Sequence, residues 1–239
     1  MSQTILANPS LLYAQKLLPL KMRNIDELFP GFAAGDFALL HGSPSIQSLI
    51  SRLCVKVQLP VQLGGLNSNV IFVDGGNSFN IHQIARLAEI HQLEPQQTLD
   101  RIHISRAFTA YQLTSLIMEK LQKSVEKSQA KLVVISDIAE LFLDPDIPEE
   151  EVRSVFNQVL SYLSNFARNN QIILIVTFPS QTRNNRNKQL QALTCERANV
   201  VVALYQTKFD REFALEKHPL YMIGSADFPS ENTTLTQFM

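Results

Sequence analysis

The sequence predicts an α/β protein with a mostly parallel, twisted sheet flanked by helices. Short apolar runs of strand length recur along the chain, and amphipathic helical segments separate them. Parallel strands need a crossover connection, which is usually a helix. After residue 199, strand-like segments follow one another without helices, so we expect a C-terminal antiparallel hairpin at one edge of the sheet.

The first half of the chain alternates between the two patterns in order. We expect a strand at residues 37–41, a helix continuing to residue 57, a strand at 69–74, a helix at 81–90, a short strand at 101–105 and a helix at 110–125. Asp74-Gly75-Gly76 closes the second strand, as turn residues do. This order predicts one growing sheet with helical crossovers.

The second half continues the alternation with longer segments. We expect strands at 132–136, 172–177 and 199–205, short strands up to residue 223 and one long helix at 149–169. The helix keeps apolar residues at spacings of three and four, and three glutamates stand at its start, where the helix dipole favours them. The predicted organisation is a lead-in segment at 1–28, a core at 29–223 and a flexible tail at 224–239.

Composition excludes several classes of protein. The formal net charge is −1 and the isoelectric point about 6.5, so no global field favours nucleic acid or a membrane surface. The N-terminus lacks the pattern of a signal peptide, and no apolar run is long enough to span a bilayer. The two cysteines and the histidines lack metal-ligand spacing. We therefore expect a cytoplasmic protein with reduced thiols and no metal site.

A glycine turn between the first strand and its helix has the context of a phosphate-binding loop. The run is Gly42-Ser43-Pro44-Ser45-Ile46-Gln47-Ser48-Leu49, whereas such a loop reads G-x-x-x-x-G-K-[ST]. Gln47 stands at the second glycine, Ser48 at the lysine and Leu49 at the hydroxyl residue. The loop therefore lacks the charge for the phosphates and the hydroxyl for Mg²⁺. The alternative is an ordinary strand–turn–helix.

Together the segments resemble the ATPase core of the RecA/RadA recombinase family, in its archaeal and eukaryotic branch. The resemblance covers residues 25–223 and rests on the order of several short runs. These runs are FPGF at 29–32, GDFALLHG at 35–42, FVDGGNSF at 72–79, ERANV at 196–200 and FALEKHP at 213–219. The implied fold is a RecA-like P-loop NTPase core with a mostly parallel sheet.

Departures from the family concern the residues that carry its chemistry. The resemblance implies a catalytic Glu after the second strand, where this chain has Gly76, and a Walker B Asp at the position of Ser136. Asp137 is one residue further on, and a slip of one residue at a strand end redirects the side chain. Phe178 replaces a polar sensor residue. We therefore expect a pseudo-ATPase that does not hydrolyse ATP with Mg²⁺ and needs no cofactor, although residual anion or nucleotide binding remains open.

The family resemblance also places two DNA-facing loops in this sequence. The first corresponds to residues 143–151, which are acidic and would repel phosphates. The second corresponds to residues 180–189, where Arg183, Arg186 and Lys188 are candidates for contacting single- or double-stranded DNA. The alternative is a solvated mobile loop. The first 30 residues contain no F-x-x-A tether, so filament formation by this chain alone is not expected.

The C-terminus resembles the short peptide that binds sliding clamps. In the run NTTLTQFM, Leu235 and Phe238 would be the apolar anchors, and Met239 would replace the second aromatic residue. The alternative is a plain disordered tail.

The leading hypothesis is a catalytically inactive RecA/RadA-like paralogue, a DNA-binding or recombinase-accessory module in DNA recombination or repair. A recombinase or a clamp would be its partner, in a homo- or hetero-oligomer. A second hypothesis is a non-enzymatic oligomeric scaffold of RecA/KaiC-like fold outside DNA metabolism. A third is an unorthodox ATPase that uses Asp137.

Overall fold

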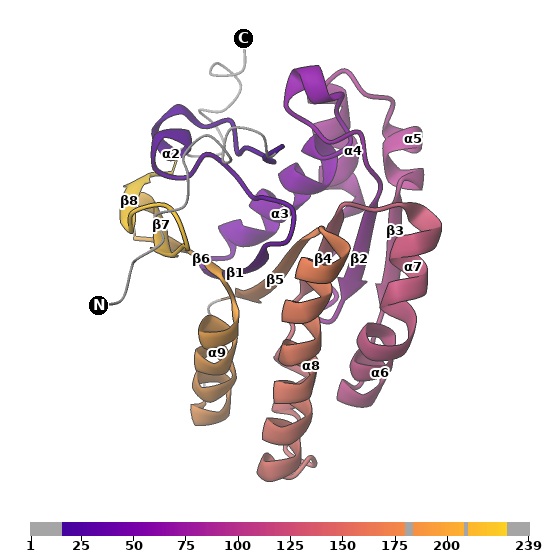
Figure 1. The fold of residues 1–239 in the computed structure, drawn as a ribbon, viewed down its shortest axis with the longest axis vertical. Coiled ribbons are helices and arrows are strands. Elements are labelled where there is room, and N and C mark those ends of the chain that lie inside the picture. The colour runs from indigo at the N-terminus through magenta and orange to yellow at the C-terminus, as the bar shows by residue number, and fades with distance from the viewer. Residues whose placement is uncertain (1–15, 180–183, 208–209, 229–239) are drawn as a thin grey trace, which may run out of the picture.

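An eight-stranded sheet forms the centre of the protein, in a computed structural model that describes residues 16–179, 184–207 and 210–228 (Figure 1). The strand order is β3-β2-β4-β5-β1-β6-β7-β8. The strands are β1 Phe37–Gly42, β2 Val70–Asp74, β3 Ile102–Arg106, β4 Leu132–Ser136, β5 Ile173–Pro179, β6 Val200–Gln206, β7 Arg211–Lys217 and β8 Gly224–Asp227. Strands β1 to β6 pair in parallel, whereas β7 and β8 join antiparallel. The predicted fold class, including the C-terminal antiparallel strands, is confirmed.

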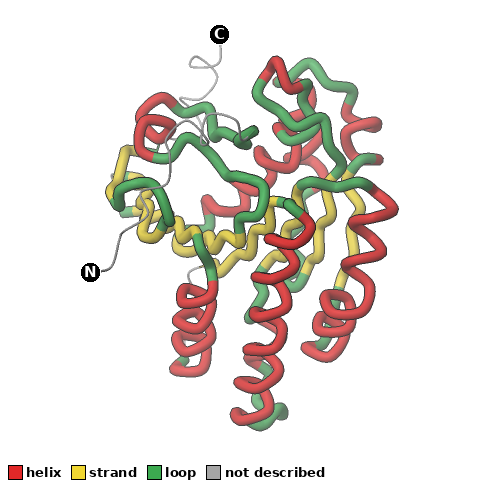
Figure 2. The backbone as a smooth tube through the Cα atoms, viewed as in Figure 1, coloured by secondary structure: helices red, strands yellow, loops and turns green. Residues whose placement is uncertain are grey.

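Helices cover both faces of this sheet (Figure 2). The α-helices are α2 Arg23–Leu28, α3 Ser45–Lys56, α4 Ile81–Ile90, α5 Pro95–Asp100, α6 Ala110–Ser115, α7 Leu121–Ser128, α8 Glu149–Asn170 and α9 Asn185–Arg197. Short turns of other helix types are η1 Val61–Leu63, η2 Leu116–Lys120 and η3 Glu140–Leu143. In Figure 1, α6, α8 and α9 lie on one side of the sheet, and α2, α3 and α4 lie on the other. Among the described residues, no helix is long and apolar enough to cross a membrane.

The side chains of β1 alternate between two apolar clusters, one on each face of the sheet. Phe37 and Leu39 belong to the apolar cluster under α8, whereas Ala38 and Leu40 belong to the cluster under α3. Successive side chains of a strand point to opposite faces, so a strand covered on both faces reads as a continuous apolar run. Strands β1, β2, β4 and β5 pair in parallel, so their carboxyl ends meet at one edge of the sheet. Open α/β sheets bind ligands at this edge.

Several predicted boundaries need correction. Residues 224–227, expected in the flexible tail, form β8, because their backbone pairs with β7 and Phe228 is buried behind them. The predicted lead-in segment packs with the core: Leu18 and Ile25 are fully buried in the α3-side cluster. The predicted helix at 110–125 continues to Ser128, with the π-helical turn η2 in its middle.

Lys56 joins the N-terminal segment to the core. It lies at the end of α3, is only 3% exposed, and donates a hydrogen bond from Nζ to the carbonyl of Leu20. Burial lowers the pKa of Lys56 to about 7, against the opposing attraction of Asp26. Burial likewise raises the pKa of Asp26. The segment is therefore held by an amine that resists protonation.

We expect this amine to make stability depend on pH. Between pH 7 and the ordinary lysine value of 10.5, the unfolded chain binds a proton that the folded chain does not, so stability rises with pH. From pH 7 to 9 the free energy of unfolding should rise by about 2 kcal/mol from this group. Urea denaturation at both pH values measures this rise, and Lys56→Met should remove it. An equal rise in the variant would assign the effect to other groups.

Candidate functional site

The glycine turn at the end of β1 is built by a close approach to β6. Gly42 has a φ of +107°, and a Cβ there would lie 2.3 Å from the carbonyl oxygen of Leu204. The amide of Ser43 donates to the same oxygen at 2.6 Å. Only glycine satisfies both the left-handed backbone and the close contact. The turn is therefore hydrogen-bonded to β6 immediately before α3 begins.

Backbone amides of this turn already donate within the chain. The amide of Ser45 donates to the side-chain oxygen of Ser43, that of Ile46 to the carbonyl of Ser43, and that of Gln47 to the carbonyl of Pro44. Pro44 has no N–H. A phosphate-binding helix start works because such amides point, unpaired, at the anion. Here the four amides from Ser43 to Gln47 have internal acceptors.

The three residues that differ from the phosphate-loop pattern, Gln47, Ser48 and Leu49, each make a contact with the rest of the structure. Gln47 Nε2 lies 3.5 Å from Asp137 Oδ1, a weak hydrogen bond that links the turn to the end of β4. Ser48 accepts a hydrogen bond from Gln83 Nε2 of α4 at 3.0 Å. Leu49 is 1% exposed and belongs to the α3-side core. These positions tie α3 to its neighbours.

Gly76 and Asp137 fill one space between them. A Cβ at Gly76 would lie 1.8 Å from Asp137 Oδ2. Asp137 adopts a φ of +50°, and its carboxylate accepts a 3.2 Å hydrogen bond from the Thr177 hydroxyl, whose oxygen accepts from the Asp137 amide at 2.9 Å. The left-handed turn after β4 therefore sends this carboxylate toward β2 and β5. Asp137 occupies the space that a side chain at residue 76 would need.

The environment of Asp137 perturbs its titration. Burial raises the pKa of Asp137 to about 6, the Thr177 hydrogen bond opposes that rise, and the negative charges of Glu140 and Asp74 add to it. A small cavity of about 180 Å³ borders this group, lined by Gly76, Asp137, Ala139, Glu140, Thr177, Phe178 and Asn187. A raised carboxyl pKa in a cavity is a mark of functional sites, although buried structural carboxyls share it.

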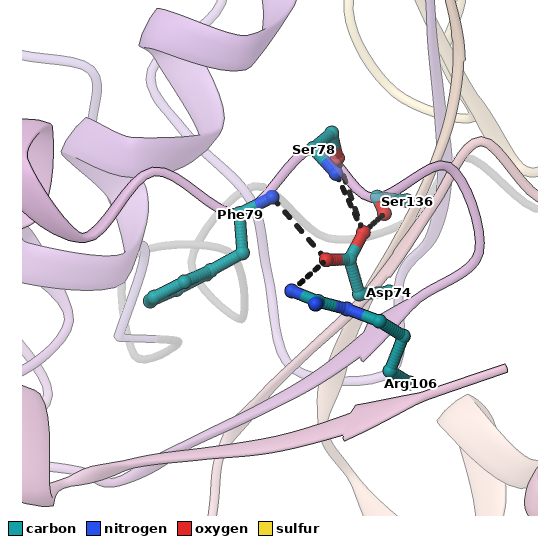
Figure 3. A network of polar contacts seen from close by, with 5 residues as sticks. All are labelled: Asp74, Ser78, Phe79, Arg106 and Ser136. Carbon is teal, nitrogen blue, oxygen red and sulfur yellow. Dashed lines mark hydrogen bonds and ion pairs between the residues drawn. The ribbon is translucent and has the colours of Figure 1, made fainter.

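Ser136 contributes to a buried network around Asp74 (Figure 3). Asp74 is 0% exposed and accepts hydrogen bonds from the Ser136 hydroxyl at 2.8 Å, the Ser78 amide at 2.8 Å, the Phe79 amide at 3.3 Å and Arg106 at 3.2 Å. We call these five residues the Asp74 network. It fastens the turn after β2 to the ends of β3 and β4. Among the described residues, no three His, Cys, Asp or Glu side chains gather closely enough to hold a metal ion.

Two of the three basic candidates lie on a helix and not in the expected loop. Residues 185–197 form α9, whose N-cap Asn184 accepts a hydrogen bond from the Asn187 amide, so Arg186 and Lys188 lie on a helix rather than a loop. Arg186 donates to the carbonyl oxygens of Asp144 at 2.7 Å and Ile147 at 3.1 Å. Lys188 is exposed, whereas Arg183 lies outside the described residues. Arg186 therefore holds the acidic 143–151 segment against α9.

We expect Arg186→Ala to destabilise the protein by about 2 kcal/mol, because the exposed carbonyl of Asp144 and the partly buried carbonyl contact at Ile147 lose a charged donor. Lys188→Ala, on the same helix and exposed, should change stability by less than about 0.5 kcal/mol. Thermal denaturation of the two variants side by side measures the difference. Equal stabilities would mean that the Arg186 contacts contribute nothing.

A larger cleft lies beside the glycine turn, between β1, β6 and α9. It has a volume of about 730 Å³ and is lined by His41, Gly42, Ser43, Pro44, Phe178, Gln191, Leu204, Tyr205, Gln206 and Thr207. We call it the β6 cleft. Sequence reasoning missed it, because it joins residues from distant segments. The only early signal was a histidine, His41, inside an otherwise apolar strand.

Hydrogen bonds fix the polar side chains at the β6 cleft. Glu216 on β7 accepts from Tyr205 at 2.5 Å and pairs with His41 Nε2 at 2.7 Å. The bond to Glu216 raises the pKa of Tyr205 to about 12, so its hydroxyl stays protonated. Gln191 of α9 contacts His41 Nδ1 at 3.1 Å.

The candidate clamp-binding residues Leu235, Phe238 and Met239 lie outside the described residues.

The strand order, the glycine turn at β1 and the site at the strand ends define a RecA-like core. A Rad51 family model matches residues 20–197, which is more than half of the chain. The chain therefore belongs to the Rad51 family. It is also similar to the DNA repair and recombination protein RadA of Cenarchaeum symbiosum, with 26% identity over 118 residues. That match covers 49% of this chain and 27% of the relative, so the chain spans only part of that protein's length.

Proposed function

We propose that this chain is a member of the Rad51 family that has lost ATP hydrolysis and acts as a DNA-binding or recombinase-accessory module. The observation that carries the proposal is the internal pairing of the turn amides. Those of Ser43, Ser45, Ile46 and Gln47 all donate to acceptors of the chain itself. A triphosphate would have to break these bonds without a lysine to replace them.

The acidic groups near the turn support the same proposal. In the Asp74 network, a buried carboxylate already accepts from five donor groups on four residues, which leaves little capacity for a Mg²⁺ ion. Asp137 is engaged by Thr177 and contacts Gln47. These contacts engage the carboxylates nearest the turn, which supports the proposed loss of a magnesium–nucleotide site.

DNA binding is proposed for the start of α9 and the segment before it. Lys188 is exposed there, and Arg183 precedes it in the sequence. Positive side chains and helix N-termini contact phosphates. Arg186 donates its hydrogen bonds to the 143–151 segment, so we propose a structural role for it rather than a phosphate contact.

Fluorescence anisotropy with labelled single- and double-stranded DNA, with and without ATP and Mg²⁺, tests this function. We expect binding that weakens with salt and does not change with ATP, and a phosphate-release assay should read background for wild type and Asp137→Ala alike. Phosphate release that Asp137→Ala abolishes would establish the unorthodox ATPase instead.

Charge reversal locates the DNA surface. Arg183→Glu with Lys188→Glu should weaken binding and lower the salt slope by about 2. The matched control is Lys123→Glu with Lys127→Glu, two exposed lysines on α7. Equal losses in both variants would indicate a non-specific charge effect. No DNA binding by wild type would favour the oligomeric scaffold, for which light scattering alone and with a recombinase is the next measurement.

A further inference from the structure

A pocket that the proposed function does not use lies at the amino ends of β1, β5 and β6, at the other end of these strands from the glycine turn. It is lined by Asp36, Gln171 and Asn199, which stand just before the three strands, and by the residues 218–221 that connect β7 to β8. Its volume is about 250 Å³. Sites for drug-sized ligands have about 300–1,000 Å³, so this pocket suits a smaller molecule. We call it the amino-end pocket.

Asp36 places a buried carboxylate in the amino-end pocket. The residue is 6% exposed, and its carboxylate accepts hydrogen bonds from the Ala33 amide at 2.7 Å and from Asn199 Nδ2 at 2.9 Å. Both donors are neutral, and burial raises the pKa of Asp36 against the opposing effect of these two bonds. A carboxylate has about four acceptor sites, so capacity remains for further donors. A cation in the pocket would therefore offset part of the cost of burying this charge.

Arg168 brings the opposite charge to the same pocket. It lies in the last turn of α8, and it is exposed. Gly35, the neighbour of Asp36, packs against this turn, since a Cβ there would lie 3.9 Å from Arg168 Cα. Within the part of the chain that the structure describes, no ion pair joins Arg168 to Asp36. The pocket thus contains a carboxylate and a guanidinium group that do not neutralise each other.

Two further side chains add a neutral donor and a neutral acceptor. His218 Nδ1 accepts from the amides of Leu220 at 3.0 Å and Tyr221 at 3.1 Å. Burial lowers the pKa of His218 to about 4, so at pH 7 the ring is neutral and its proton lies on Nε2. Gln171 Nε2 donates to the carbonyl of Arg168 at 2.7 Å, which leaves its Oε1 without a donor among the described residues. One end of each side chain is therefore fixed, and the other end can meet a ligand.

We propose that the amino-end pocket binds a small zwitterion, an α-amino acid with an apolar side chain. The ammonium group of the ligand meets the Asp36 carboxylate and Gln171 Oε1. Its carboxylate meets Arg168, because a guanidinium group pairs with a carboxylate through two parallel hydrogen bonds. Its side chain packs on Leu17 and on Leu220, which is 48% exposed. A ligand with a single charge would use only one of the two opposite charges.

Titration of the full chain with three probes of similar shape, followed by NMR, tests the need for both charges. The probes are L-leucine, 3-methylbutylamine, which lacks the carboxylate, and 4-methylpentanoate, which lacks the ammonium group. We expect saturable shifts of the Gly35 and Asp36 amides with L-leucine. Each of the other two probes should bind about tenfold more weakly or worse, which is typical of a lost hydrogen bond to a charged group. Equal affinity for either of them, or no saturable shift with L-leucine, would overturn the proposal.

Arg168→Gln separates recognition from folding, because this exposed guanidinium group makes no ion pair among the described residues. The variant should bind L-leucine about tenfold more weakly and 3-methylbutylamine as before, since only the first probe has a carboxylate. The matched control is Arg153→Gln, at an exposed arginine near the other end of α8, and it should change neither affinity. Unchanged L-leucine binding in Arg168→Gln, or equal losses in both variants, would overturn the role of Arg168.

Asp36→Asn tests the other charge. The amide oxygen can still accept from the Ala33 amide, but the negative charge is gone. The variant should weaken L-leucine and 3-methylbutylamine by the same factor and leave 4-methylpentanoate unchanged. Unchanged binding of the amine would overturn the role of Asp36, and Arg168→Gln gives an independent result if this buried substitution prevents folding. The titrations contain no DNA and the pocket lies apart from the proposed DNA surface on α9, so their failure is distinguishable from a failure of the proposed function.

Discussion

Replacing Gly76 by alanine is expected to destabilise the protein by about 3 kcal/mol, in the range of a forced contact in a packed region. A Cβ at this position would lie 1.8 Å from Asp137 Oδ2, 2.5 Å from its Cγ and 2.6 Å from its Cβ. The Asp137 side chain is restrained by the 3.2 Å hydrogen bond from the Thr177 hydroxyl, and its left-handed backbone is held by the bond from the Asp137 amide to the same oxygen. Urea denaturation of wild type and variant measures the loss.

Two variants show whether the clash with Asp137 is the cause. In Gly224→Ala, the added Cβ meets only the end of the Leu28 side chain at 3.0 Å, so its loss should be below about 1 kcal/mol. Asp137→Gly removes the obstructing carboxylate and suits the positive φ, so Gly76→Ala should cost little in that background. Additive losses in the double variant would show that Gly76 is required for a reason other than Asp137.

The contact between Gly76 and Asp137 lies at the position where the family resemblance implies a catalytic Glu. The resemblance places a catalytic Glu at Gly76, yet a side chain there and the observed Asp137 exclude each other. Reintroducing Glu at this position should therefore destabilise the chain unless Asp137 is shortened as well. Gly76 and Asp137 consequently behave as one structural unit, and single-residue restoration of the family pattern should fail.

Much of the fold was predictable because the sheet is covered on both faces. Strands such as Val70–Asp74 and Leu132–Ser136 are continuous apolar runs, and the structure confirms them within one residue of the prediction. Helix α9 was missed because its sequence is mostly polar, with Leu190 as its buried apolar anchor. Strand β8 was missed because a four-residue edge strand with half-exposed side chains carries almost no periodic signal.

The candidate site was predictable only as a set of positions. Sequence order located Gly42 at the turn and Ser136 at the end of β4, and the structure places them there. It could not reveal that Asp137 turns back toward Gly76, because this depends on one left-handed residue and a contact between strands. The His41–Glu216 contact joins residues 175 positions apart, which no local pattern records.

Removing the carboxylate of Asp74 is expected to have the largest effect of any single polar substitution in the described residues. Asp74→Ala would leave the Ser136 hydroxyl, the Ser78 and Phe79 amides and Arg106 without their acceptor. Breaking a buried charged network costs about 3–5 kcal/mol. The exposed Arg106 side chain can regain water, so we expect about 4 kcal/mol in urea denaturation.

Partner variants apportion this loss within the Asp74 network. Ser136→Ala alone should cost about 1 kcal/mol, and its effect should nearly vanish in the Asp74→Ala background, because the hydroxyl then has no acceptor to lose. Asp100→Ala is the control, since that exposed carboxylate accepts from Gln96 and should lose less than about 0.5 kcal/mol. A loss at Asp74 no greater than the control's would mean that water replaces the carboxylate. In that case the hydrogen bonds to Asp74 would not be what holds the turn after β2 against the end of β4.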